Sequence, residues 1–210
     1  MKEKKAIKHK DYSADLTGGP LFTDEFDNLF GKTSIEEVLD SEWDKSILLI
    51  NSEAAKQRVS QEIRKRLKTE SRLFFWEGYN ESTPNEKPLL LLYVCAKTYN
   101  VLFDFLHQVI FEKMRSYQKQ LGKEDFGFFV ERKKNDHPEL EDWSESTLKK
   151  VTNVIFLMLR QSGILKNDQL HLPDVSNHLI LLFSELNEKW FLEFLMVPFD
   201  KLKKLNNGDK

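Results

Sequence analysis

Apolar residues recur at helical spacing along most of this chain, and residues 54–68 give the clearest example. On a helical wheel of about 100° per residue, one side of this stretch is apolar over about a third of the circumference. That side holds Ala55, Val59, Ile63 and Leu67. Asn51 and Ser52, just before it, are good N-cap residues. The pattern predicts a helix with one buried stripe.

The opposite side of this predicted helix is basic. Its positions carry cations and amides but no carboxylate: Gln57, Arg58, Gln61, Arg64, Lys65 and Lys68. Residues 34–50 read as one or two short helices. A short helix, a tight Asn-Ser turn and a second helix with a cationic outer side are what a DNA-binding helix-turn-helix requires. Lys and Arg also solvate ordinary exposed helices, and that interpretation stays open on this helix alone.

Residues 89–114 open with an apolar run, LLLLYVCA, that invites a membrane interpretation. A membrane span needs about 20 mostly apolar residues, whereas Lys97, Asn100, Asp104 and His107 follow this run at close intervals. The pattern instead predicts the central buried helix of a domain that stays in solution without detergent. Residues 80–88 are polar and turn-rich, which predicts a boundary between an N-terminal helical domain (1–85) and a C-terminal one (86–210).

Beyond that boundary, Ser144 is the predicted N-cap of a long helix that Gly163 ends. Its wide apolar stripe holds Leu148, Val151, Val154, Ile155, Met158 and Leu159. Residues 164–172 alternate like a small hairpin, so helix and hairpin resemble the wing unit of winged-helix proteins. Because cations occur only at Lys149, Lys150 and Arg160, we expect this helix to belong to the core rather than to bind DNA. Residues 175–197 predict a last, very hydrophobic helix.

Charge and cysteine content limit the function classes. The formal net charge is -2, with 32 basic against 34 acidic residues, so attraction to nucleic acid must come from local segregation of charge. Such segregation occurs in residues 1–10, where five lysines stand against Glu3 alone; this segment predicts a disordered tail or a flexible arm onto DNA phosphates. The single cysteine, Cys95, excludes an intrachain disulfide and favours the reducing cytoplasm.

The sequence offers little for catalysis. Residues 17–20 read TGGP without a following Gly-Lys-Ser/Thr, so they predict a turn rather than a phosphate-binding loop. The histidines show no metal-ligand spacing with one another or with Cys95: His9, His107, His137, His171 and His178. No carboxylates stand out as an acid/base pair. We therefore expect no enzyme activity, no cofactor and no metal.

Several stretches, taken in order, resemble the BrxA family of the BREX (bacteriophage exclusion) defence systems of bacteria. They are YSADLTGGPL (12–21), SEAAKQR (52–58), EIRKRL (62–67), HPEL (137–140), SEST (144–147) and FLMLRQSGIL (156–165). The resemblance implies an almost wholly helical protein, likened to the antitermination factor NusB, with helix-turn-helix character and DNA binding. Other BREX components carry the methyltransferase, ATPase and phosphatase-like activities, which agrees with the missing active site. The region 72–85 departs from the family pattern.

The sequence thus predicts an all-α protein of two helical parts with helix-turn-helix character and one small hairpin near 164–172. We expect it to bind double-stranded DNA without catalysis, and other BREX proteins are further candidate partners. The predicted phosphate contacts are Lys56, Arg58, Arg64, Lys65 and Lys68, and the candidates for base edges are Gln57 and Gln61, since Gln can bond bidentately to adenine. Two alternatives stay open: RNA binding, from the NusB likeness, and a scaffold whose apolar C-terminal helix docks other defence proteins.

Overall fold

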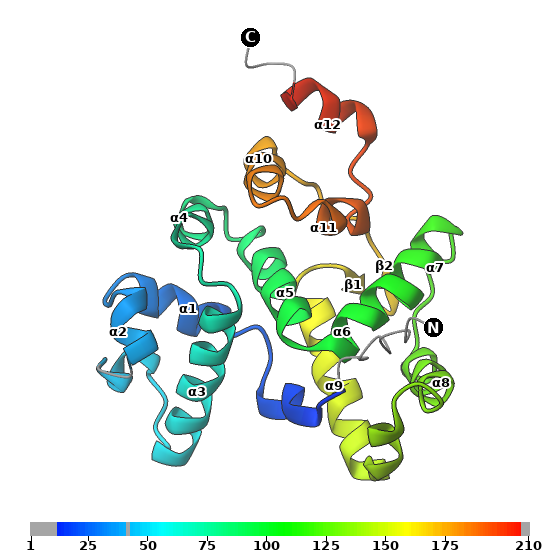
Figure 1. Ribbon diagram of the computed structural model, residues 1–210, viewed down its shortest axis with the longest axis horizontal. Coiled ribbons are helices and arrows are strands. Elements are labelled where there is room, and N and C mark those ends of the chain that lie inside the picture. The colour runs from blue at the N-terminus through cyan, green and yellow to red at the C-terminus, as the bar shows by residue number, and fades with distance from the viewer. Residues whose placement is uncertain (1–11, 41–42, 207–210) are drawn as a thin grey trace, which may run out of the picture.

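The computed structural model describes residues 12–40 and 43–206 of the chain. These residues are mainly helical, with one two-stranded antiparallel sheet (Figure 1). The all-α fold with a small hairpin is therefore confirmed. The basic N-terminal segment, residues 1–10, lies outside the described residues.

The N-terminal part includes four helices that lie at the left of Figure 1, α1 to α4, of which α3 is the longest. Its elements are η1 (Ala14–Gly18), α1 (Thr23–Phe30), α2 (Ile35–Asp40), η2 (Lys45–Leu48), α3 (Glu53–Thr69) and α4 (Leu73–Glu81). The predicted N-cap is confirmed, because the Ser52 hydroxyl accepts the Ala55 N–H at 3.4 Å. Val59, Ile63 and Leu67 are buried. The two short elements expected before the helix, α2 and η2, both pack against it.

The single helix predicted over residues 89–114 is wrong. The chain forms α5 (Lys87–Thr98), α6 (Asn100–Phe105), a π-helical turn η3 (Leu106–Ile110) and α7 (Phe111–Arg115), with a bend of 113° after α5. The bend is at Tyr99, whose backbone is extended (φ -125°, ψ 105°). Tyr99 is buried and its hydroxyl donates to the Glu62 carboxylate of α3. These dihedral angles lie outside the helical region, so the helix ends at Tyr99, where the side chain makes this tertiary contact.

The apolar run at the start of this segment is buried as predicted, since every residue from 89 to 96 in α5 lies in the core. Within the described residues, no one helix combines the length and the apolar character that a membrane span requires. Helix α5 and the helical segment after the bend, Asn100–Arg115, reach the length and apolar composition of a membrane span only when they are counted together.

The second half continues with α8 (Lys123–Lys133), η4 (Pro138–Asp142) and α9 (Glu145–Gln161). The predicted cap at Ser144 is confirmed, because its hydroxyl accepts the Thr147 N–H at 3.1 Å. The hairpin is confirmed too: β1 (Leu165–Lys166) pairs with β2 (Gln169–Leu170). Asn167 and Asp168 between them both have positive φ, at 50° and 57°, as a two-residue turn of type I′ requires.

The single C-terminal helix predicted over residues 175–197 is also wrong. The chain forms α10 (Asn177–Glu185), α11 (Lys189–Phe194) and α12 (Phe199–Asn206). Asn187 has a left-handed backbone, φ 57°, which ends α10. The next residue, Glu188, turns its carboxylate toward Lys97 of α5 at 2.9 Å. An ion pair from another helix thus stabilises the interruption.

Within the described residues, the buried apolar side chains form one cluster that runs through both halves of the chain. Leu29 and Ile63 from the N-terminal part share it with Leu92 of α5, Ile155 of α9 and Phe183 of α10. The division into two domains at residue 85 stays a prediction.

Candidate nucleic-acid interface

The proposed contact residues of α3 do not all face solvent equally. Arg58, Gln61 and Lys68 are exposed, and they contact no charged or hydrogen-bonding partner within residues 12–40 and 43–206. A shallow surface hollow of about 460 Å³ lies beside them. It is lined by Gln61, Arg64, Lys65, Lys68 and Thr69, so its lining holds three cations and no carboxylate. This hollow is the part of the described surface where the predicted cations of α3 converge.

Two cations of the hollow also hold the fold together. Arg64 Nε donates to the Leu39 carbonyl oxygen of α2 at 2.6 Å. Lys65 Nζ lies 3.3 Å from Asp15 of η1 and 4.7 Å from the centroid of the Tyr99 ring. The hydrogen bond from Ser13 and that from Lys65 outweigh the effect of burial and hold the pKa of Asp15 below its ordinary value. These contacts fix both cations at the surface instead of leaving them mobile.

The remaining two candidates are engaged within the chain. Lys56 has only 16% of its side chain exposed and pairs with Glu53 at 2.5 Å. Lys56 therefore does not point outward as a phosphate contact should. On the helical wheel it falls about 100° from Ala55, between the buried residues Ile63 and Leu67. Gln57 is exposed, and its amide oxygen accepts a hydrogen bond from Lys45 Nζ at 2.9 Å. Contact with nucleic acid stays a prediction for all seven residues.

Arg66 is the residue of α3 whose role the sequence analysis missed. It is fully buried, and its guanidinium donates to the carbonyl oxygens of Pro20 at 2.7 Å, Gly19 at 3.1 Å and Leu21 at 3.2 Å. The signal was present, because Arg66 falls about 20° from Ala55 on the wheel, inside the apolar stripe. A cation there must find buried acceptors, since an unpaired buried charge is very costly.

The carbonyls that Arg66 holds belong to the glycine-containing segment near the N-terminus. The turn predicted there is confirmed: η1 ends at Gly18, and Gly19 follows it in a non-helical conformation. A Cβ on Gly19 would lie 2.1 Å from Cζ of Phe22, so the close approach of that ring requires glycine. In Figure 1 this segment lies between α3 and α9, and η1 packs against both. The glycines therefore serve packing.

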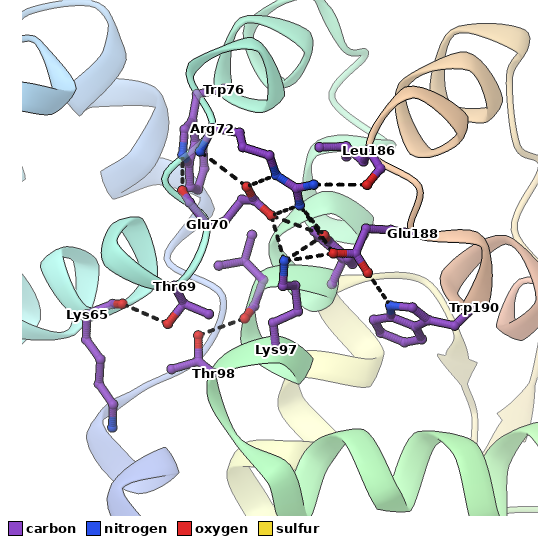
Figure 2. Close-up of polar contacts among 12 residues, drawn as sticks. Lys65, Thr69, Glu70, Arg72, Trp76, Lys97, Thr98, Leu186, Glu188 and Trp190 are labelled. Carbon is purple, nitrogen blue, oxygen red and sulfur yellow. Dashed lines mark hydrogen bonds and ion pairs between the residues drawn. The ribbon is translucent and has the colours of Figure 1, made fainter.

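A second polar cluster anchors the C-terminal end of α3 (Figure 2). Glu70, the C-cap residue, is 1% exposed and lies 3.0 Å from Lys97 Nζ of α5, with Arg72 at its other side. Glu188 faces the same two cations, at 2.9 Å from Lys97 and 3.3 Å from Arg72. The network joins the end of α3 to α5 and to the start of α11. The basic side of α3 is therefore presented by a helix fixed at its C-terminal end.

The protonation of this cluster follows from its contacts. Burial by itself would raise the pKa of Glu70, but the hydrogen bonds from Arg72 and Lys97 outweigh it and hold the pKa below its ordinary value. The pKa of Glu188 is lowered in the same way: burial opposes the shift, and hydrogen bonds from Lys97 and Trp190 prevail. Both carboxylates are therefore ionised at neutral pH, with two cations between them.

The histidines and the cysteine do not gather into a metal site in the described part of the chain. No group of three or more His, Cys, Asp or Glu residues there could hold a metal ion. His137 is buried, with its ring stacked on Tyr12 at 3.7 Å and Nδ1 3.0 Å from Glu139. His178 Nε2 lies 3.0 Å from the Gly78 carbonyl oxygen. Cys95 is fully buried, and burial raises the pKa of its thiol.

Comparison with known proteins gives the family. The BrxA family model matches residues 10–184. The chain belongs to the BrxA family. "BREX protein BrxA" of Bacillus cereus (strain H3081.97) is 26% identical to this BrxA-family chain over 133 residues, which cover 63% of the chain and 66% of that relative. "BREX protein BrxA" of Paramagnetospirillum magneticum (strain ATCC 700264 / AMB-1) is 23% identical over 194 residues, covering 89% and 96%.

The fold of this BrxA-family chain also occurs in a solved structure. A crystal structure of an uncharacterized protein from Magnetospirillum magneticum superposes with a TM-score of 0.72 at 21% identity, covering 89% of this chain and 98% of that one. At this identity the likeness shows the fold alone.

Proposed function

We propose that this BrxA-family protein is a non-enzymatic, double-stranded-DNA-binding component of a BREX phage-defence system, acting in the cytoplasm. The relatives named "BREX protein BrxA" support the assignment to such a system. The observation that carries DNA binding is the hollow on α3, whose lining holds Arg64, Lys65 and Lys68, with Asp15 as the one carboxylate of the described residues paired to any of the three. Gln61 also lines this hollow, and the exposed Arg58 extends the surface along the helix.

The chemistry of this surface fits the DNA backbone. Lysine and arginine bind duplex DNA by displacing condensed counterions, so the logarithm of affinity falls with the logarithm of salt, by about 0.9 per phosphate neutralised. Phosphate contacts position a protein on the duplex, and base contacts give it sequence preference. On α3, Gln61 is the exposed amide without a partner in residues 12–40 and 43–206, which makes it the stronger candidate for a base edge.

The test is a salt titration of duplex binding with neutralised variants. Arg58→Gln with Lys68→Gln removes the two cations of α3 that have no charged or hydrogen-bonding partner within the described residues. Its salt slope should fall by about 2 units. Adding Arg64→Gln and Lys65→Gln should bring the total fall to about 3–4 units and largely abolish binding near physiological salt.

The matched control neutralises three exposed cations on other helices, Arg115, Arg132 and Lys189, each replaced by Gln. It should leave the slope within about 1 unit of that of the unmodified protein. Equal losses in control and α3 variants would show that only overall charge matters. Competition between duplex DNA and structured RNA at equal salt tests the other nucleic acid, and preference for RNA would contradict the proposal.

A further inference from the structure

An apolar pocket lies where the ends of α7 and α11 meet the hairpin, and it shares no residue with the hollow on α3. Its volume is about 340 Å³, at the small end of the range of about 300–1,000 Å³ that is usual for ligand pockets. The pocket therefore admits one or two side chains of a partner. The lining residues that matter here are Met114, Tyr117, Lys119, Leu170, Leu172 and Met196.

The pocket lies where two paired segments of the chain separate. Residues 119–121 run antiparallel to β2, and the Leu170 N–H donates to the Lys119 carbonyl oxygen at 2.7 Å. Among the described residues, no hydrogen bond joins the two segments beyond this one, and the backbone N–H groups of Lys119 and Leu172 have no acceptor. Free main-chain donors at the edge of a strand can bind an extended peptide.

Two lining residues have left-handed backbones although neither is glycine. Tyr117, with φ 59°, follows α7, and Met196, with φ 55°, follows α11. Each helix ends in a Schellman motif; in α7 the Tyr117 N–H donates to the Met114 carbonyl oxygen at 3.1 Å, and the Gln118 N–H donates to that of Lys113 at 2.8 Å. Glycine is the usual residue at this position, because a Cβ disfavours the left-handed conformation. Strained residues that gather at one site indicate a function there.

The side chains at the rim of the pocket add little to the core. Tyr117 is 90% exposed and Leu172 is 54% exposed. Aromatic side chains are enriched where proteins bind one another. Met114 and Met196 line the same pocket, and the flexible methionine side chain adapts to the shape of a bound partner. These features are typical of a protein-binding surface.

The charge around the pocket indicates the kind of partner. Lys119 is the cation of the lining, which includes no carboxylate. Residues 113–123 include four cations and no acidic residue. Lys113 and Arg115 pair with carboxylates of the chain, whereas the Lys119 ammonium has no charged or hydrogen-bonding partner in the part of the chain that the structure describes. Lys119 is therefore available to an acidic partner.

We propose that this pocket binds an extended acidic segment of a partner protein. A leucine or aromatic side chain of that segment lies among Met114, Leu170 and Met196, and a neighbouring carboxylate pairs with Lys119. The free N–H groups of Lys119 and Leu172 bind the carbonyl oxygens of its main chain. A phosphate backbone would gain nothing from the apolar lining, which favours a protein over a nucleic acid. The inference goes beyond DNA binding by α3 and does not depend on it.

The first test selects peptides on the full chain from a display library of short random sequences. Peptides that bind should carry acidic residues beside a leucine or an aromatic residue. The pocket variant, Lys119→Glu with Leu172→Ser, changes two exposed positions and should fold. It should bind the selected peptides at least about tenfold more weakly in fluorescence polarisation, as expected when interface hot spots are lost.

The matched control makes the same two changes outside the pocket. Lys189→Glu with Leu181→Ser replaces an exposed lysine of α11 and an exposed leucine of α10. This control should bind the selected peptides as tightly as the unmodified protein does. Equal losses in the control and in the pocket variant would show that overall charge, not the pocket, determines binding, and would contradict the inference.

The variant Tyr117→Gly separates binding from folding. Glycine adopts a φ of 59° without the cost of a Cβ, and the side chain that is lost is 90% exposed, so the thermal midpoint should stay equal or rise. The selected peptides should nevertheless bind at least about tenfold more weakly. A purely structural role of Tyr117 would instead lower the midpoint and leave the peptide affinity unchanged.

The remaining outcomes also decide the matter. If no peptide is enriched, or if the selected peptides bind the pocket variant as tightly as the unmodified protein, the inference is wrong. Loss of duplex-DNA binding in the pocket variant, without peptide enrichment, would assign the pocket to nucleic acid instead. Self-association that the pocket variant abolishes, measured by sedimentation, would identify a second copy of the chain as the occupant and would equally overturn the inference. Because these variants leave α3 unchanged, the DNA-binding proposal is tested separately.

Discussion

At the residue scale, Arg66 shows how one buried cation can organise a segment distant in sequence. Its guanidinium holds three successive carbonyls, of Gly19, Pro20 and Leu21, and so ties the N-terminal segment to α3. The same segment reaches α9, where the Leu21 N–H donates to the Gln161 side chain at 3.2 Å. Arg66 therefore stabilises the packing of two helices against a segment without long regular structure.

We expect Arg66→Met to lower the free energy of unfolding by about 3 kcal/mol or more, because each buried acceptor left without its donor costs about 1–3 kcal/mol. Methionine keeps an unbranched side chain of similar length, so the loss reports mainly on the hydrogen bonds. Urea unfolding followed by circular dichroism measures it. Arg58→Met, at an exposed position of the same helix, should change stability by no more than about 0.5 kcal/mol; equal effects at the two positions would contradict the assigned role of Arg66.

A second prediction at this scale concerns acid stability. Glu70 and Glu188 have pKa values below their ordinary 4.5 in the folded protein. A carboxyl group with a lowered folded-state pKa stabilises the fold above its unfolded-state pKa, and this stabilisation is lost as pH falls through the folded-state pKa. We therefore expect Glu70→Gln to be less stable than the unmodified protein at pH 7, and the difference to shrink below about pH 4.5.

Urea midpoints between about pH 7 and pH 3 test this acid prediction. Glu193→Gln, which removes an exposed carboxylate of α11, controls for the loss of one negative charge. A stability difference for Glu70→Gln that stays constant over the whole range would show that the ion pairs of Figure 2 do not couple folding to pH.

At the scale of elements, α9 has two roles that composition alone does not separate. Its buried side packs in the core, and its exposed side carries Lys149, Lys150 and Arg160. The helix α3 has the same division, with Ile63 and Leu67 inside and a cationic hollow outside. Each is a helix whose packing residues and surface residues can be altered independently.

This division predicts unequal effects of substitutions in α9. Ile155→Ala or Leu159→Ala, each at a fully buried position, should lower the free energy of unfolding by about 2–5 kcal/mol through lost burial and the cavity left behind. Lys149→Ala, on the exposed side, should have little effect. Thermal unfolding of the three variants measures this. A similar shift in all three midpoints would mean that the buried side is wrongly assigned.

At the scale of the whole molecule, the buried side chains of the described residues join into one cluster across residue 85. Tyr99 contributes to this continuity through its bond to Glu62, and the Glu70 network adds ion pairs between α3, α5 and α11. We expect contacts of this kind to couple the unfolding of both halves.

We expect one cooperative unfolding transition in spite of the polar stretch at residues 80–88. Two variants test this: one keeps only Trp43 and Trp76 as fluorescent reporters and the other keeps only Trp143 and Trp190, with Phe at the remaining positions. Their fluorescence midpoints should each coincide with the circular-dichroism midpoint of the same variant, as in two-state unfolding. Separate transitions for the two halves would instead support two independent domains.

The sequence by itself determined the helices whose signals are local. Ser52 and Ser144 cap α3 and α9 as predicted, and their apolar stripes are buried, because capping and amphipathic spacing depend on residues within a few positions of one another. The hairpin also followed from its own turn residues. The family resemblance predicted from ordered short stretches is confirmed by the match over residues 10–184.

Only the tertiary structure decided where two long apolar stretches break and which cations of α3 are available. Both breaks coincide with polar contacts to distant elements. At the first break, the Tyr99 hydroxyl donates to Glu62 of α3. At the second, Glu188, which follows Asn187, pairs with Lys97 of α5. Likewise, a helical wheel shows that Arg66 lies on the buried side, but the carbonyls that accept its hydrogen bonds come from a segment over 40 positions away. A local sequence pattern does not contain such distant partners. Only the tertiary structure therefore shows which charged side chains are buried and which groups they pair with.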